Sequence, residues 1–185
     1  MKATGIVRRI DDLGRVVIPK EIRRTMRIRE GDPLEIYTDR EGEVIFKKYS
    51  PIGELASFAS QYAETLYKTC GMAVLITDRD AVIAVAGVSR KEYAERALSE
   101  EMEKLMEGRG VYTWREGSEK LYPTREAGKE FVSCAMPIVS EGDVVGCVIS
   151  LGEGEGARMR ETLDGDLESK LVQTAAGFLG RQLEN

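Results

Sequence analysis

The sequence contains no histidine and only three cysteines, Cys70, Cys134 and Cys147, among its 185 residues. The missing histidine removes the most common general base and the most common transition-metal ligand. An odd number of cysteines, none of them spaced as a metal-binding pair, argues against a disulfide framework and against a zinc site. We therefore expect a protein that is not an enzyme and that holds neither a metal nor a cofactor.

Long apolar runs are missing as well. No stretch approaches the roughly 20 residues that span a bilayer. The first residues pass directly into patterned sequence, without the apolar segment of a secretory signal. The 42% hydrophobic content is ordinary for a globular protein, so we expect no membrane contact and a cytoplasmic location.

The net charge of −5 conceals an uneven distribution of charge along the chain. Residues 1–29 carry nine Lys/Arg and three acids, a net charge of +6, whereas residues 51–185 carry 15 Lys/Arg and 23 acids, a net charge of −8. Such an asymmetry indicates a part that faces nucleic acid joined to an acidic part. A solvated basic face is the alternative interpretation, and a basic cluster inside an otherwise acidic chain disfavours it.

The first residues predict a hairpin followed by a short helix. Residues 5–10 and 15–18 alternate as strands around the turn at residues 11–14, Asp-Asp-Leu-Gly. Pro19 suits the first position of a helix that continues to about Met26.

A second hairpin is predicted over residues 34–38 and 44–49, before a boundary at Ser50. The predicted domains are therefore residues 1–50 and 51–185. A unit as short as the first is only marginally stable alone, because it has too few apolar residues to cover both hairpins. We expect two chains to dimerise through it.

From residue 52 the spacing of the apolar residues changes. Helical periodicity predicts amphipathic helices over 52–69 and from about 158 to 183, and the capping box of Ser89 and Glu92 opens a predicted helix over 90–107. Buried strands are expected at 72–77, 81–86, 131–139 and 143–151, with short strands near 111–114 in an irregular segment. This order describes an α+β domain with an antiparallel sheet, bracketed by two helices that suit a bundle between subunits.

Several other features of the second domain have two interpretations each. Cys134 and Cys147 fall roughly opposite each other on one predicted hairpin, and cysteines inside strands usually act as small hydrophobic residues rather than redox groups. Residues 152–156, Gly-Glu-Gly-Glu-Gly, lack the Lys-Ser/Thr of a phosphate loop and are predicted to be a hinge. Four side chains of the irregular segment either line a pocket or cover the sheet edge: Tyr112, Trp114, Tyr122 and Arg125.

Basic side chains in the first domain are the candidate DNA contacts. They are Arg8, Arg9, Arg15, Lys20, Arg23 and Arg24. Arg8 and Arg15 are expected near the turn of the first hairpin, and Arg23 and Arg24 on the short helix. Guanidinium groups fit both phosphate oxygens and guanine edges, and a two-fold dimer doubles the set.

The string Leu-Gly-Arg-Val-Val-Ile-Pro-Lys-Glu-Ile-Arg at residues 13–23 is long and specific. Together with Gly-Asp-Pro-Leu-Glu-Ile-Tyr at residues 31–37, it closely resembles the AbrB-type transition-state regulators of spore-forming bacteria. The resemblance covers about residues 1–50 and implies a swapped-hairpin β-barrel made by two chains. It also implies that four arginines face double-stranded DNA: Arg8, Arg15, Arg23 and Arg24. Family members often have a lysine where this chain has Arg9, which keeps the charge.

The chain further resembles members of this family in which a GAF-like domain follows the first unit. That resemblance implies a homotetramer joined through the C-terminal domains. It also implies regulation of sporulation genes in the developing forespore, with some activated and others repressed. GAF domains usually bind a small molecule, so an unidentified effector is expected; the Asn-Lys-Phe-Asp-Glu signature of cyclic-nucleotide-binding members is absent, which disfavours that ligand.

Two other functions remain open on the sequence. Swapped-hairpin units also serve as antitoxin-like interaction modules, although those usually end in a disordered acidic tail and this C-terminal part is patterned as a globular domain. A redox enzyme built on the GAF-like domain is the second alternative, and the missing histidines disfavour it. Sequence-specific DNA binding by a transcription regulator is the leading hypothesis.

Overall fold

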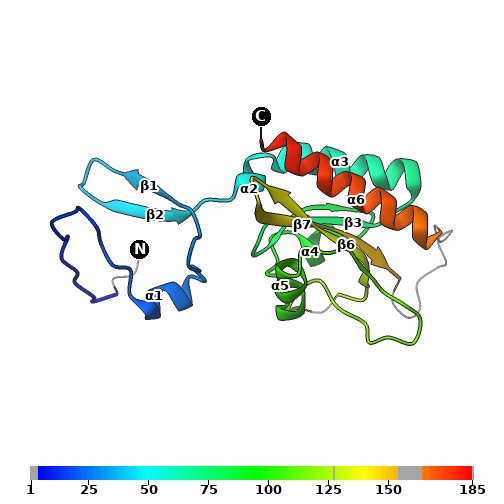
Figure 1. Cartoon of the computed structure of the whole chain (residues 1–185), viewed down its shortest axis with the longest axis horizontal. Coiled ribbons are helices and arrows are strands. Elements are labelled where there is room, and N and C mark those ends of the chain that lie inside the picture. Colours follow the sequence, from blue (N-terminus) through cyan, green and yellow to red (C-terminus); the bar gives the residue numbers. More distant parts are fainter. Residues whose placement is uncertain (1–3, 127, 154–163, 185) are drawn as a thin grey trace. The chain divides into compact units, whose positions relative to one another are not determined.

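The structure is a computed structural model that describes residues 4–126, 128–153 and 164–184. The chain divides into two compact units, Met1–Tyr49 and Ser50–Asn185, whose elements are labelled in Figure 1. Both units combine a helix with antiparallel strands, which confirms the predicted α+β class. Most of the predicted hinge and the start of the last predicted helix fall in residues 154–163, outside the described residues.

The first unit holds one short helix and one hairpin. Helix α1 covers Lys20–Thr25, and strands β1 (Leu34–Thr38) and β2 (Val44–Lys48) pair antiparallel, with Leu34 opposite Lys48. The predicted helix and the predicted second hairpin are therefore confirmed. Asp39 closes this hairpin, because its carboxylate accepts hydrogen bonds from the backbone amides of Glu41 and Glu43 at 3.0 and 2.9 Å.

The predicted strands at 5–10 and 15–18 are wrong for the single chain, in which residues 4–19 form no strand. Most of their apolar side chains are exposed in the single chain: Val7 is 89% exposed and Val17 is 71% exposed. A two-stranded hairpin without a packed face is at best marginally stable in water. The predicted turn is present, with Gly14 at φ +78°, a left-handed conformation that suits glycine.

The second unit is built on a five-stranded antiparallel sheet in the order β4-β3-β7-β6-β5. The strands are β3 (Val74–Thr77), β4 (Val82–Ala86), β5 (Tyr112–Thr113), β6 (Phe131–Ser140) and β7 (Asp143–Gly152). Each coincides with a predicted strand, although β6 and β7 run one residue further than the predicted 131–139 and 143–151. The long hairpin β6–β7 pairs from Phe131 opposite Gly152 to Ser140 opposite Asp143. Its strands are inner strands of the sheet, because β7 also pairs with β3 and β6 also pairs with β5.

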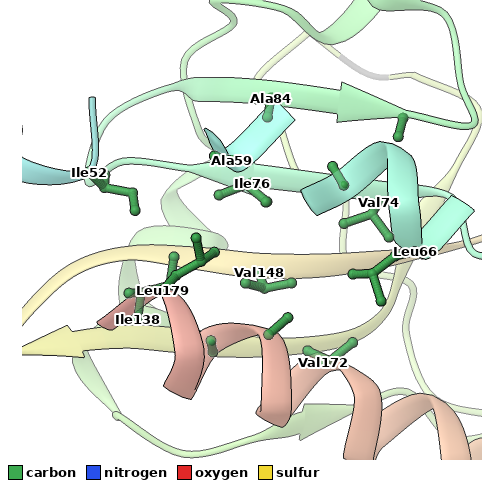
Figure 2. Packing of buried hydrophobic residues seen from close by; sticks show 14 of the residues in the cluster. Ile52, Ala59, Leu66, Val74, Ile76, Ala84, Ile138, Val148, Val172 and Leu179 are labelled. Atoms are coloured by element: carbon green, nitrogen blue, oxygen red, sulfur yellow. The ribbon is translucent and has the colours of Figure 1, made fainter. Parts of the chain in front are cut away.

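Helices α3 (Ala56–Cys70) and α6 (Gly165–Gln182) lie side by side over one face of this sheet (Figures 1 and 2). The helix predicted from residue 52 is interrupted, because α2 (Pro51–Glu54) ends before α3 begins. Ile52 on α2 is fully buried in the same cluster as Val172 and Leu179 on α6. This face therefore holds a continuous apolar core.

The opposite face is covered by two short helices, α4 (Arg90–Tyr93) and α5 (Glu100–Glu107). The single helix predicted over 90–107 is wrong, because the chain between them pairs with β4 instead. Val82 donates to the carbonyl oxygen of Arg96 at 3.0 Å, and Glu95, at φ +63°, donates back to Val82 at 2.9 Å. The side chain of Ser89 caps nothing, whereas that of Ser99 accepts from the Met102 amide and opens α5.

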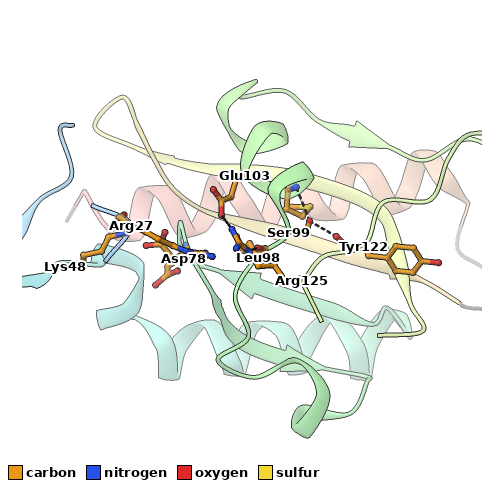
Figure 3. Close-up of polar contacts among 10 residues, drawn as sticks. Arg27, Lys48, Asp78, Leu98, Ser99, Glu103, Tyr122 and Arg125 are labelled. Carbon is orange, nitrogen blue, oxygen red and sulfur yellow. Dashed lines mark hydrogen bonds and ion pairs between the residues drawn. The ribbon is translucent and has the colours of Figure 1, made fainter. Parts of the chain in front are cut away.

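Polar contacts attach the irregular segment to these helices (Figure 3). Ser99 Oγ donates to the carbonyl oxygen of Tyr122 at 2.7 Å, and Arg125 Nε donates to that of Leu98 at 3.1 Å. The Trp114 ring lies 4.8 Å from the Phe131 ring at the sheet edge. These contacts favour the interpretation in which the segment covers the sheet.

The two cysteines of the β6–β7 hairpin are not opposite each other, contrary to the sequence expectation. Cys134 pairs with Ser150 and Cys147 with Pro137, and the two side chains enter the cores on different faces of the sheet. Burial raises the pKa of both thiols. Both groups therefore stay protonated near neutral pH and act as apolar core residues.

Two glycines of α6 give a test of how closely this helix packs on the sheet. A Cβ atom at Gly180 would overlap the Val139 carbonyl oxygen of β6, whereas at Gly177 it would meet nothing within 4 Å. We expect Gly180→Ala to lower the free energy of unfolding by roughly 1–3 kcal/mol through overpacking. The matched control Gly177→Ala should raise it by about 0.5–1 kcal/mol, because alanine favours helix. Thermal unfolding of the full chain measures both, and equal shifts would contradict this packing.

Candidate nucleic-acid interface

All six predicted DNA contacts are exposed side chains of the first unit. Arg8 and Arg9 precede the turn at residues 11–14, and Arg15 follows it. Lys20 is the first residue of α1, and Arg23 and Arg24 lie in its last turn. The structure therefore carries the six cations on two short neighbouring segments of one unit.

Asp11 anchors Arg15 at the turn. One carboxylate oxygen of Asp11 accepts from the backbone amides of Leu13 and Arg15 at 3.0 and 2.7 Å, and the other accepts from Arg15 Nε at 2.8 Å. Hydrogen bonds from the Arg15 amide and then from its guanidinium hold the pKa of Asp11 below its usual value. The carboxylate is therefore ionised near neutral pH, and it orients a guanidinium that is otherwise exposed.

The end of α1 is fixed by its own backbone. Ile28 donates to the carbonyl oxygen of Arg23 at 2.8 Å and Arg27 donates to that of Arg24 at 3.3 Å. These two bonds form a Schellman motif, in which the residue after the C-cap takes a left-handed conformation; here that residue is Arg27, at φ +53°. The backbone of both candidate arginines on α1 thus takes part in the helix ending.

Reasoning from the sequence missed the roles of three residues of this unit: Asp11, Asp32 and Lys48. Asp11 was assigned to the turn but not to the orientation of Arg15, although Asp at the start of a turn that ends in Gly is a known signal for such side-chain bonds. Lys48 contacts the carbonyl oxygen of Arg27 and the carboxylate of Asp32. No local pattern predicts that contact, because it joins residues 21 positions apart.

The first unit also exposes most of its apolar side chains. The exposed large apolar side chains are Ile6, Val7, Ile10, Leu13, Val16, Val17, Met26, Ile36, Tyr37, Val44, Phe46 and Tyr49. Both core clusters found among the described residues are made by the second unit alone. A basic surface and an uncovered apolar surface therefore belong to the same unit.

Comparisons with known proteins agree with this division. Residues 54–184 match the family described as "Stage V sporulation protein T C-terminal, transcription factor". Residues 7–53 match "Antidote-toxin recognition MazE, bacterial antitoxin". The chain is 51% identical to stage V sporulation protein T of Bacillus subtilis (strain 168) over 185 residues, which are 100% of this chain and 99% of that protein.

Two solved structures cover one unit each. The N-terminal DNA recognition domain of the Bacillus subtilis transition-state regulator AbrB is 65% identical over 26% of this chain and 91% of that chain, with a TM-score of 0.23. The GAF domain of PixJ from Thermosynechococcus elongatus is 13% identical over 73% of this chain and 90% of that chain, with a TM-score of 0.46.

The unit boundaries, the basic first unit and these matches place the chain among the bacterial transcription regulators. More particularly, it belongs to the stage V sporulation protein T family. The predicted resemblance to AbrB-type regulators is confirmed as well, because the chain is 65% identical over 51 residues to the transition state regulatory protein AbrB of Bacillus subtilis (strain 168). The full-length match favours a regulator over an antitoxin. In the described residues, none of the helices is long and apolar enough to cross a membrane.

Proposed function

We propose that the chain binds double-stranded DNA as a dimer and regulates the transcription of sporulation genes in the developing forespore, activating some and repressing others. The observation that carries this proposal is the set of six exposed cations on one unit. They lie in a chain that is 51% identical to stage V sporulation protein T over its whole length. The overall charge of −5 makes a general attraction to DNA a poor alternative explanation.

Each candidate group has a distinct role in this proposal. Arg15, held by Asp11 through Nε, presents the rest of its guanidinium to a phosphate or a guanine edge, and Arg8 and Arg9 stand on the other side of the turn. Arg23 and Arg24 on α1 supply two further guanidinium groups that suit the same phosphate and guanine acceptors. Lys20 adds a point charge for the phosphate backbone.

The uncovered apolar side chains of the first unit support the dimer. Residues 5–18 carry alternating apolar side chains but form no strand in the single chain beyond the backbone bonds of the turn, which is compatible with a hairpin exchanged between two chains. Burial of such side chains stabilises an assembly by about 25 cal/mol per Å² of apolar surface removed from water. A second copy of the same unit supplies a surface of matching chemistry and doubles the number of DNA-facing arginines.

The outer surface of α3 and α6 supports a tetramer. Tyr62 and Phe178 stack with ring centroids 5.6 Å apart, and Phe58 lies 5.9 Å from Phe178. Phe178 is 40% exposed and Leu167 on the same helix is 46% exposed. A second copy of this helix pair covers these side chains and joins two DNA-binding dimers, which adds avidity for paired sites.

The remaining expectations follow from the family resemblance. A GAF-like regulatory role for residues 51–185, an unidentified small-molecule effector, a cytoplasmic location and the lack of enzymatic activity all stay predictions. Screening metabolites for a shift in the melting temperature of the full chain tests the effector, because a ligand of the folded state raises that temperature.

DNA binding by the named cations is tested by substitution and by salt. We expect alanine at Arg8, Arg15, Arg23 or Arg24 to abolish binding to a duplex that the wild-type protein selects from a random pool. Arg40→Ala, which removes an exposed arginine from the β1–β2 turn of the same unit, serves as the control and should bind nearly as well as wild type. The log–log slope of affinity against salt should be on the order of −5 to −7 for a dimer that neutralises about 6–8 phosphates. A flat salt response, or unchanged binding in all four variants, would refute the proposal.

The tetramer is tested by native mass. We expect four chains for the wild-type protein and two for Phe178→Glu, because a carboxylate in a closed apolar interface is costly. Gln173→Glu is the matched control, since it adds the same charge at another exposed position of α6; it should remain tetrameric. A wild-type dimer, or the same mass for both variants, would contradict the proposed use of this surface.

A further inference from the structure

We propose that Lys48 and Asp32 are positioning residues that lock the end of α1 to the β1–β2 hairpin and so set the orientation in which Arg23 and Arg24 meet DNA. The inference rests on the proposed DNA binding and adds to it two residues that do not themselves touch DNA. Lys48 belongs to β2 and Asp32 to the loop between α1 and β1.

The contact point is the chain reversal that follows α1. Arg27 takes a left-handed conformation there, at φ +53°, a region in which residues other than glycine are uncommon. Lys48 Nζ donates to the carbonyl oxygen of Arg27 at 2.9 Å (Figure 3). The Lys48 ammonium therefore stabilises the backbone at Arg27, the residue of this reversal that has the uncommon left-handed conformation.

The carboxylate of Asp32 contacts both Lys48 and the backbone that follows α1. One of its carboxylate oxygens accepts from the Arg29 amide at 2.8 Å and lies 3.5 Å from Lys48 Nζ. The Asp32 side chain is only 3% exposed and that of Lys48 only 26%. Buried charges are stable in proteins when they are paired and hydrogen-bonded, and Asp32 and Lys48 supply part of that pairing to each other.

The anchor itself is rigid because Lys48 lies within the hairpin. Its backbone pairs opposite Leu34 in β1, and the next residue, Tyr49, donates to the carbonyl oxygen of Pro33 at 3.0 Å. On the side of the helix, the Arg23 and Arg24 carbonyls accept the two bonds that define the reversal. A shift of Arg27 is therefore passed directly to the backbone of both arginines.

The competing explanation is that Lys48 itself contacts a DNA phosphate. Substitution of Asp32 distinguishes this explanation from the positioning role, because the two predict opposite changes in DNA affinity. If charge alone mattered, replacing the Asp32 carboxylate with a neutral amide would strengthen binding to a polyanion. The positioning role predicts the opposite, because the amide cannot hold the Lys48 ammonium. Removing a negative charge then weakens DNA binding.

The experiment measures affinity of the full-length protein for the selected duplex and for a random-sequence duplex. Asp32→Asn and Lys48→Met should each lower affinity for the selected duplex about tenfold, the loss of one hydrogen bond to a charged group. Affinity for the random duplex should change much less. The double variant should be no worse than the weaker-binding single variant, since both break one link, and Lys48→Arg should retain most of the binding. Glu41→Gln, which removes an exposed charge from the same unit, should bind as well as wild type or slightly better.

The outcomes distinguish this inference from the proposed function. Binding by Asp32→Asn that equals or exceeds that of Glu41→Gln overturns the positioning role, as does a loss from Lys48→Met that is equal on both duplexes. Thermal unfolding and native mass run on the same samples: loss of the folded dimer in both single variants would mean that the pair holds the unit together, which also overturns it. If the wild-type protein selects no duplex, or if the alanine variants of Arg8, Arg15, Arg23 and Arg24 all bind normally, the proposed function fails instead. Normal binding by Arg23→Ala and Arg24→Ala alone overturns the positioning role only.

Discussion

The first unit leaves most of its own apolar side chains exposed, and the proposed dimer and its DNA-binding surface both follow from this constraint. Val7, Ile10 and Val17 are each more than two-thirds exposed, and the segments that carry them form no strands in the single chain. The candidate DNA-binding arginines lie on these same segments and on the short helix that follows. In the proposed function, dimerisation and DNA recognition would therefore be one event, because the contact that covers the apolar residues would also order the segments that carry the candidate arginines.

The second unit is built in the opposite way. Its sheet is covered on both faces, with Ile52, Val148 and Leu179 fully buried on one side and Tyr93 and Ile149 on the other. Burial of these residues does not depend on another chain, which suits the scaffold role that the proposed tetramer assigns to this unit. The acidic charge of this part also disfavours non-specific contact with DNA, which leaves recognition to the basic unit.

Much of this organisation was predictable from the sequence, and the errors have physical causes. Turn residues and alternating apolar patterns located the β1–β2 and β6–β7 hairpins, and the charge asymmetry with the Leu-Gly-Arg-Val-Val-Ile-Pro string identified the candidate arginines.

The single helix predicted over 90–107 was wrong because Glu95 and Arg96 pair with β4, a tertiary contact that local propensity does not contain. The prediction that Cys134 and Cys147 lie opposite each other was wrong because the register shifts in the β6–β7 ladder are not visible in the sequence. Lys48 was missed for a similar reason, since its partner Arg27 is distant along the chain.

The most direct test of the central claim is amide hydrogen exchange at residues 7–10 and 16–18, followed over a range of protein concentration. These residues form no strands in the single chain, so protection there requires partners from a second chain. We expect slow exchange at high protein concentration that is lost on dilution as the dimer separates, because exchange reports the free energy of local opening. Exchange at the rate of an unstructured peptide at every concentration would contradict it.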